Sequence, residues 1–374
     1  MPRGTFVPTE LAQRRLATAV VVALTVLVAK PGQTLPATLA AVALILGTLV
    51  LIRLGKAGPT TLVALVGIGV ILRLIRFRAV EADPLTVTVA AINQALSGMS
   101  PYSIGPAGSL LGSSTFPYGP VSLAWYFPVQ FEPRLMELAA ATAVLVALAV
   151  WRRPLGLAIY ASAPIFVLLA TDGSNDTSAG LLILLALVVA ERHARAGGAF
   201  LAVAAAFKPY AAAWLLPLVA WAGLLPLVAF LAASAVLWLP LLAWGPGSFV
   251  GALHRAEDVH AASYYSLAAG LEQVLGRPMD KAMFGPLRLV LGLGTAIFVW
   301  VAIRSHDAVV VGGSLVFLVT MYAGYWGTPA YLAAIAPILC WKVDGWVTRA
   351  PVRESVSIEH PLHPMAGTEL PEAL

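Results

Sequence analysis

The sequence predicts an all-α protein, a polytopic transmembrane helix bundle of about 10–12 membrane segments with two longer loops on its outer face. The prediction rests on three observations. Hydrophobic residues make up 60% of the 374 residues, charged residues make up only 11%, and the mean hydropathy is +0.87. A soluble domain typically carries about 25% charged residues. Most of this chain must therefore face lipid, and its apolar content also excludes intrinsic disorder.

The charged residues and the single cysteine exclude several kinds of function. Cys340 has no second cysteine to pair with, which excludes an internal disulfide and a cysteine-based zinc site. The net charge is +5, with 23 Lys and Arg against 18 Asp and Glu, but the basic residues are scattered along the chain. We therefore expect no nucleic-acid partner and expect the basic excess to orient helices in a membrane.

Long apolar runs mark the membrane segments. A spanning helix needs about 20 mostly apolar residues, and shorter segments are tolerated inside a bundle. The clear candidates are 35–52, 60–77, 135–151, 155–171, 225–244, 284–303, 308–325 and 329–346. Two shorter candidates are 16–29 and 178–190. No small-x-small cleavage site follows 16–29, so we interpret it as a helix and not as a signal peptide.

The apolar segment 198–222 is interrupted by Lys208-Pro209. Proline removes a backbone donor and clashes with the preceding turn, so it breaks a helix. We interpret this segment as two short halves that form a hairpin within the membrane. The alternative is a single span.

The path of 198–222 decides the topology. If it turns back, the two long and less apolar stretches, 79–133 and 245–283, lie on the same side, opposite both chain ends. A single span would place them on opposite sides. Basic residues concentrate in the short loops on the side of the termini, which favours the hairpin. We therefore expect a multi-pass protein of the plasma (inner) membrane, in which 1–346 form the membrane domain and 347–374 a cytoplasmic polar tail.

Two acids, Glu81 and Asp83, follow directly after the predicted helix 60–77. Asp83 before Pro84 is typical of a helix cap with proline at the first helical position. A carboxylate at a membrane–water boundary is also partly shielded from water, which suits a general base that accepts a hydroxyl proton. Capping and base catalysis are compatible, so both interpretations stay open.

A polar junction, 171–177, separates two apolar segments and reads Thr-Asp-Gly-Ser-Asn-Asp-Thr. These residue types are typical of a turn. Asn175 and Asp176 at a helix junction are also suited to binding sugar hydroxyls or a metal ion. The spacing matches no established metal-binding loop.

Lys208 lies within an apolar stretch and directly before a helix breaker, Pro209. A lysine at the centre of a membrane helix costs about 2.5–3.5 kcal/mol, so it marks a functional site by default. The alternative is that its side chain snorkels to the interface. Irregular backbone at membrane depth is tolerated where it lines a cavity, and a cation there suits a lipid-linked phosphate.

The second long stretch carries a group of charged and ring-bearing residues: His254, Arg255, Glu257, Asp258, His260, Tyr264 and Tyr265. A solvated loop face explains them. The sharper interpretation is a phosphate-binding or acid–base group, and the histidines with the acids also form a loose, nonspecific metal-ligand pattern.

Arg73 and Arg76 lie one turn apart near the outer end of 60–77 and therefore share a helix face. They either neutralise a phosphate or an anionic headgroup, or snorkel to the interface. Tyr102 and Tyr118 lie in two short Gly- and Pro-rich turns, and both are candidates for stacking on sugar faces.

Several familiar motifs are absent from the sequence. It has no Walker phosphate loop, no Gly-x-Ser-x-Gly elbow and no His-Glu-x-x-His helix. Nucleotide-driven transport and serine catalysis of the α/β-hydrolase type therefore have no support.

The remaining motifs resemble the GT-C superfamily of integral membrane glycosyltransferases, and within it the family 87 polyprenyl-phosphate-mannose-dependent α-mannosyltransferases. The matching motifs are Asp83 in the first outer loop, Gly98–Tyr102, Phe116–Pro120, Pro164 with Gly173–Asp176, and Ala204–Pro209. The resemblance covers roughly residues 60–270. Two positions depart from the family pattern: Ser100 replaces the usual Asn before Pro-Tyr, and Pro84 follows the acid directly.

The resemblance implies a GT-C-like fold, with 1–346 as a catalytic domain whose active site lies on the periplasmic or extracellular face. It implies transfer of a sugar, which is mannose in the family, from a polyprenyl-phosphate-linked donor to a lipid or glycan acceptor. Membrane lipids are the other expected partners. Asp83 would be the base in an inverting single displacement. Lys208, Arg255 and Arg76 would bind the donor phosphate. The expected substrate-binding residues are Glu81, Tyr102, Tyr118, Asn175, Asp176, His254, His260 and Tyr264.

The sequence also bears on cofactors and on functions other than sugar transfer. No cofactor is expected, and a divalent ion at Asp83 or Asp176 stays open. A secondary transporter also uses a broken helix, but the internal repeat and paired intramembrane charges typical of transporters are not seen in the sequence. A polymerase or ligase of lipid-linked glycans and a non-catalytic scaffold are further alternatives. For a scaffold, Asp83→Asn and Lys208→Ala would change stability alone.

Overall fold

The computed structural model describes residues 35–77, 84–103, 115–258, 263 and 265–348. Within these ranges the chain is all-helical and has no β-strand, as the sequence predicts. In chain order the α-helices are α2 (Leu35–Arg53), α3 (Pro59–Arg76), α4 (Pro84–Leu96), α5 (Pro120–Tyr126), α6 (Arg134–Val150), α7 (Pro154–Ser162), α8 (Pro164–Leu169), α9 (Asp176–Arg192), α10 (Ala194–Phe207), α11 (Leu215–Ala222), α12 (Leu225–Leu237), α13 (Leu239–Trp244), α14 (Pro246–Asp258), α15 (Leu267–Leu275), α16 (Phe284–Ala302), α17 (His306–Tyr322) and α18 (Tyr331–Thr348). Short 3-10 helices are η1 (Phe127–Val129), η2 (Pro209–Trp214) and η3 (Lys281–Met283).

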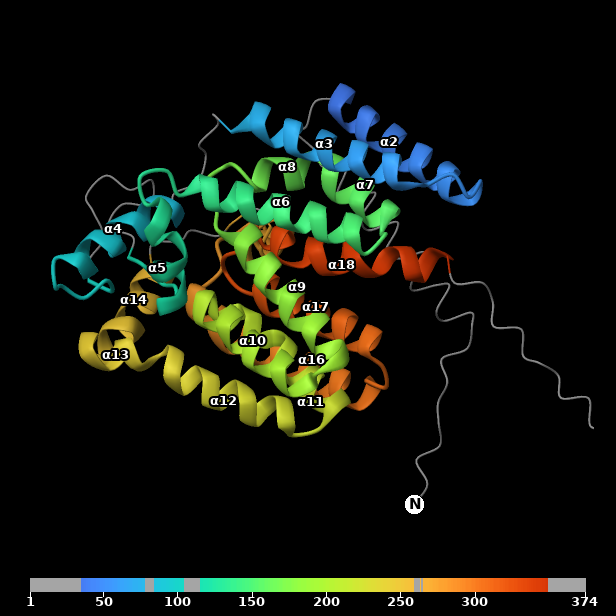
Figure 1. Cartoon of the computed structure of the whole chain (residues 1–374). Coiled ribbons are helices and arrows are strands. Elements are labelled where there is room, and N and C mark those ends of the chain that lie inside the picture. The colour runs from blue at the N-terminus through green and yellow to red at the C-terminus, as the bar shows by residue number, and fades with distance from the viewer. Residues whose placement is uncertain (1–34, 78–83, 104–114, 259–262, 264, 349–374) are drawn as a thin grey trace, which may run out of the picture.

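The helices pack in successive layers (Figure 1). α2 and α3 lie at one edge and pack against α7, and α3 also packs against α6. α9 and α18 form the centre, where α9 contacts α6 and α10 and α18 contacts α7. α10 then packs on α12, which lies at the opposite edge, and α16 packs on α17. α9 is therefore covered from both sides by its two neighbouring layers.

Small residues allow the helices to approach closely. An ideal Cβ on Gly156 of α7 would lie 1.8 Å from the carbonyl oxygen of Cys340 in α18. Small residues at helix crossings are typical of membrane bundles, because close backbone contact replaces the hydrophobic effect as the driving force.

Three helical stretches in the described part of the chain are long and apolar enough to cross a membrane: Leu35–Arg53, Pro59–Arg76 and Lys281–Ala302. A fourth crossing arises if α5 with η1 and α6, which are bent by 100° relative to each other, form one span. Large apolar side chains on these helices point outward, including Val63 at 72% and Phe298 at 69% exposure. Such an outward apolar surface suits lipid and not water, so the protein is membrane-associated.

Most expected segments correspond to observed helices, but two are broken. The predicted segment 155–171 divides at Ala163–Pro164 into α7 and α8, and 225–244 divides after Leu237 into α12 and α13. Proline disfavours helical backbone in the residue before it, and Ala163 before Pro164 accordingly has φ −59° and ψ 115°. At the second break Trp238 keeps φ −94° and ψ 0°, and Pro240 is the second residue of α13. The predicted segment 16–29 lies outside the described residues.

The segment 198–222 is broken where the sequence predicts. α10 ends at Phe207, Lys208 has extended backbone with φ −136° and ψ 118°, and η2 leads into α11. An ideal Cβ on Gly198, near the start of α10, would lie 2.2 Å from the carbonyl oxygen of Pro226 in α12. The chain between these residues therefore returns to the level at which α10 began, which confirms the reversal.

The described parts of the two long, less apolar stretches contain helices and lie against each other. The first contains α4 and α5, and the second contains α14 and α15. The hydroxyl of Thr115 donates to the carbonyl of Ala252 over 3.0 Å, and the hydroxyl oxygens of Ser100 and Ser248 are 3.3 Å apart. The described parts of the two stretches therefore lie at the same end of the helix bundle.

Candidate functional site

A buried ion pair lies at the break after α10. The Nζ atom of Lys208 is 2.8 Å from Oδ1 of Asp176, the first residue of α9, and the two side chains are 6% and 3% exposed. The hydroxyl of Tyr210 donates to the same Oδ1 over 2.6 Å. The ammonium also faces the rings of Tyr118 and Tyr210, at 5.0 and 5.2 Å from their centroids. Lys208 therefore does not snorkel, and Asp176 neutralises its charge.

Pro209 explains how the sequence creates this geometry. The residue before a proline prefers extended backbone, so Lys208 leaves the helix and its side chain turns toward α9. The carbonyl of Phe207, freed at the helix end, accepts the N–H of Gly119 over 3.2 Å. An ideal Cβ on Gly119 would lie 2.0 Å from the carbonyl oxygen of Ala206, so only glycine permits this approach. The contact places Tyr118 beside Lys208.

The junction 171–177 is a turn, and all its residues are buried. The carboxylate of Asp172 accepts the N–H of Ser174 over 2.8 Å, and Gly173 has φ of +99°, which glycine adopts without strain. The carbonyl of Gly173 accepts the N–H of Leu85 over 3.1 Å. The start of α4 is therefore fixed at the junction that carries Asn175 and Asp176.

Asn175 is the least satisfied polar side chain at this junction. It is fully buried, and neither its Oδ1 nor its Nδ2 has a hydrogen-bond partner. It is the N-cap residue of α9, yet its side chain makes no capping hydrogen bond. A buried polar group left unpaired costs about 1–3 kcal/mol, and such groups in native proteins call for an explanation such as a bound ligand, water or ion.

Glu137 is a buried carboxylate to which the sequence analysis assigned no role. It lies in the first turn of α6 and is fully buried. It accepts the hydroxyl of Tyr126 over 2.5 Å, the N–H of Ser178 over 3.1 Å, and the hydroxyl of Ser178. Trp125 donates to the same hydroxyl oxygen over 3.0 Å. A single acid in the apolar run 135–151 was the available signal, but its partner Ser178 lies 41 positions away in the sequence.

Arg255 and Tyr102 lie in a second group beside the ion pair. One N–H of the Arg255 guanidinium donates to the carbonyl of Tyr102 over 2.8 Å, and Nε has no partner. Ring centroids connect Tyr102 to Phe116 at 5.6 Å and Phe116 to Tyr118 at 5.4 Å. A row of three rings therefore runs from Arg255 to Lys208.

Tyr102 differs from expectation. It is fully buried, because the rings of Phe116, Trp244 and Phe249 surround it. Burial raises the pKa of its phenol, which therefore stays neutral. Its ring has no face open to a sugar, so Tyr102 shapes the site from within, whereas Tyr118 is only half-buried.

The two arginines of α3 also separate. Arg73 is fully buried, and its guanidinium donates to the carbonyls of Gly69 over 3.0 Å and Tyr160 over 2.9 Å. The expectation that Arg73 shares a phosphate-binding or snorkelling role with Arg76 is therefore wrong. The bond to Tyr160 connects α3 to α7, and Arg76 is exposed.

Four expected site residues lie outside the described residues: Glu81, Asp83, His260 and Tyr264. His254 is exposed on α14. Among the described residues, no three His, Cys, Asp or Glu side chains lie close enough to hold a metal ion. The site as described therefore consists of an ion pair, a buried amide, an arginine and a half-buried ring.

A search of protein-family models, curated proteins and solved structures finds no match to this chain.

Proposed function

We propose that this protein is a membrane glycosyltransferase that moves a sugar from a polyprenyl-phosphate-linked donor to a lipid or glycan acceptor. The observation that carries the proposal is the buried amide of Asn175, which has no partner and lies next to the Lys208–Asp176 pair. An amide offers both a donor and an acceptor, the pairing that a sugar hydroxyl also offers. Leu85, in the first turn of α4 and two residues after Asp83 in the sequence, is held at the same junction by its N–H bond to the carbonyl of Gly173.

The packing modifies the roles that the resemblance implies. Because Asp176 neutralises the charge of Lys208, the ion pair positions the side chains of the site. Lys208 binds a phosphate only when this ion pair breaks. Arg255 is better suited to the donor phosphate, since it forms no ion pair within the described part of the chain and its Nε is unpaired. Asn175 and Tyr118 face the sugar, and Asp83 is the base.

The reaction is a single displacement. The acceptor oxygen attacks the anomeric carbon and gives its proton to Asp83. The bond between the anomeric carbon and the phosphate oxygen breaks, and its electron pair stays on the lipid phosphate. Arg255 stabilises the negative charge that develops there. One displacement inverts the anomeric centre and requires no enzymic nucleophile, unlike the retaining reaction with a covalent intermediate.

The first test is sugar transfer by the purified protein in lipid, with labelled polyprenyl-phosphate mannose as the donor. Wild type is compared with Asp83→Asn and with Glu132→Gln, a matched control in the same stretch whose carboxylate pairs with Arg134 at 2.7 Å. We expect transfer by wild type and Glu132→Gln, and its loss in Asp83→Asn. Equal transfer by all three would remove Asp83 as the base.

A second variant tests the observation that carries the proposal. Asn175→Ala removes a side chain that makes no hydrogen bond, so its free energy of unfolding should not fall. If the amide binds substrate, transfer should fall about tenfold to hundredfold, the equivalent of a lost buried hydrogen bond. A destabilised variant with wild-type transfer would show that the amide is structural.

The buried ion pair at a helix break also favours a second candidate, a secondary transporter of a small or lipid-linked solute. This candidate predicts solute flux into sealed vesicles without chemical change, and loss of the flux in Asp176→Asn. If no lipid-linked sugar is turned over and flux is observed, the transporter replaces the glycosyltransferase.

A further inference from the structure

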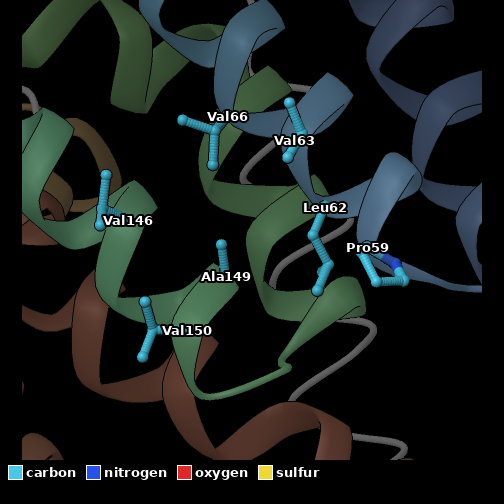
Figure 2. Close-up of a pocket in the computed structure, with 7 residues that line it drawn as sticks. All are labelled: Pro59, Leu62, Val63, Val66, Val146, Ala149 and Val150. Atoms are coloured by element: carbon cyan, nitrogen blue, oxygen red, sulfur yellow. The ribbon is translucent and has the colours of Figure 1, made fainter.

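An apolar groove of about 370 Å³ runs along the outside of the bundle between α3 and α6. Figure 2 shows side chains of the two helices facing each other across it. The first turns of α3 and the last turn of α6 line it, with Pro59, Leu62, Val63, Val146, Ala149 and Val150. α3 begins and α6 ends at this end of the bundle, so the groove lies near two short loops.

Both loops carry exposed positive charge. Lys56 lies three residues before Pro59, and Arg152 lies two residues after Val150. Both side chains are exposed, as is Arg53 at the end of α2. None of the three forms an ion pair with another residue in the described ranges. The apolar groove therefore ends beside cations that form no ion pair with any residue the structure describes.

We propose that this groove binds an anionic phospholipid, with an acyl chain between α3 and α6 and the headgroup phosphate beside Lys56 and Arg152. The groove offers apolar surface without a polar side chain, which suits a hydrocarbon chain. Basic residues at the ends of membrane helices attract anionic headgroups. The combination selects a lipid over a soluble apolar ligand, which would not need the cations. This inference is independent of the proposed sugar transfer.

The probe is phosphatidylglycerol, offered in nanodiscs against phosphatidylcholine of the same chain length. Bound lipid is counted by native mass spectrometry of the full-length protein after stepwise removal with detergent. Wild type should retain phosphatidylglycerol in preference to phosphatidylcholine. Lys56→Gln and Arg152→Gln should each weaken retention by about fivefold, and the matched control Arg277→Gln, exposed in the turn after α15, should not.

A second variant tests the groove itself. Val63 is 72% exposed, so Val63→Trp fills the groove without crowding the core, and Val301→Trp, at 63% exposure on α16, is its control. Val63→Trp should abolish selective retention, and Val301→Trp should leave it unchanged. The proposal fails if the two tryptophan variants retain the lipid equally. It also fails if wild type retains both lipids equally, because the groove then holds only non-selective annular lipid.

Discussion

Buried polar side chains of this protein differ in how completely their partners satisfy them. The carboxylate of Asp176 accepts hydrogen bonds from an ammonium and a phenol, and that of Glu137 accepts them from two hydroxyls and a backbone N–H. The side chain of Asn175 makes no hydrogen bond within the described residues. Satisfied groups are expensive to disturb, because removing one partner leaves the other buried and unpaired. An unsatisfied group can be removed at little cost. This contrast allows structural and ligand-binding roles to be separated by stability measurements.

The Lys208–Asp176 pair should be strongly coupled. Asp176→Asn leaves a buried ammonium without a countercharge, and such a change costs about 3–5 kcal/mol. The double variant Asp176→Asn with Lys208→Met removes both charges, so it should be more stable than Asp176→Asn alone. The free energy of unfolding in mixed micelles measures both. A double variant less stable than either single variant would show that the pair does not act as a buried unit.

Glu137 should matter far more than its neighbour Glu132. Glu137→Ala leaves the Tyr126 hydroxyl and the Ser178 N–H without their acceptor, and each unpaired group costs about 1–3 kcal/mol. Glu132 is 30% exposed and pairs with Arg134, so Glu132→Ala should cost less than about 1 kcal/mol. Similar unfolding free energies for the two variants would contradict the hydrogen bonds assigned to Glu137.

At the scale of elements, prolines end helices and glycines bring them together. Proline begins η2 after α10 and α8 after α7, and each break reorients the chain inside an otherwise apolar run. Gly119 and Gly156 lie where a neighbouring backbone leaves no room for a Cβ. The site depends on both effects, because the break frees Lys208 and the close approach at Gly119 places Tyr118 beside it.

The surroundings of two glycines, Gly156 and Gly67, predict that replacement by alanine has opposite effects on stability at the two positions. Gly156→Ala would place Cβ 1.8 Å from the carbonyl oxygen of Cys340, so α7 and α18 must separate; overpacking of this kind typically costs about 1–3 kcal/mol. Gly67 in α3 has no atom within 4 Å of the same position, and there alanine should stabilise by about 0.5–1 kcal/mol through its helix preference. Thermal unfolding of the two variants tests the signs. A Gly156→Ala protein as stable as wild type would contradict the close crossing.

At the scale of the whole molecule, the length of the helices limits how they can cross a membrane. α6, α9 and α17 have 17 residues each, which at 1.5 Å per residue gives about 25 Å against a hydrocarbon core of about 30 Å. Short and broken helices need neighbours to cover their ends. α9 has such neighbours because it is buried between two layers, whereas the longer α2, α3 and α16 and the shorter α12 carry outward apolar surface.

The expected topology can be tested by cysteine labelling. Cys340 is fully buried, so a Cys340→Ala background should give no signal. The helices α3 and α6 pack as an antiparallel pair. Phe131 lies before α6 and Lys56 lies before α3, so these two exposed residues mark opposite ends of the pair, and each is replaced by cysteine. A membrane-impermeant maleimide added to intact cells should label Phe131→Cys, and Lys56→Cys only after lysis. Arg152→Cys should behave like Lys56→Cys. Labelling of all three in intact cells would contradict a spanning α3–α6 pair.

Much of the helical layout could be predicted from the sequence. Composition and apolar run length placed most helices within a few residues, because lipid-facing helices must be apolar along their length. The break at Lys208-Pro209 was also predicted from local sequence, because proline ends a helix wherever it occurs in the interior of one. The breaks at Ala163 and Trp238 were missed, because hydropathy does not report backbone direction.

The sequence by itself determined that this protein is helical and rich in lipid-facing surface, and that Lys208, Asn175 and Asp176 occur at helix ends. Only the tertiary structure decided which of these side chains meet. It paired Lys208 with Asp176, left Asn175 unpaired, placed Arg73 inside the bundle and gave Glu137 its three donors. The physical reason is that chain-local propensity and hydropathy act over a few residues. Hydrogen bonds and ion pairs between helices instead join residues from 11 to 87 positions apart in these examples.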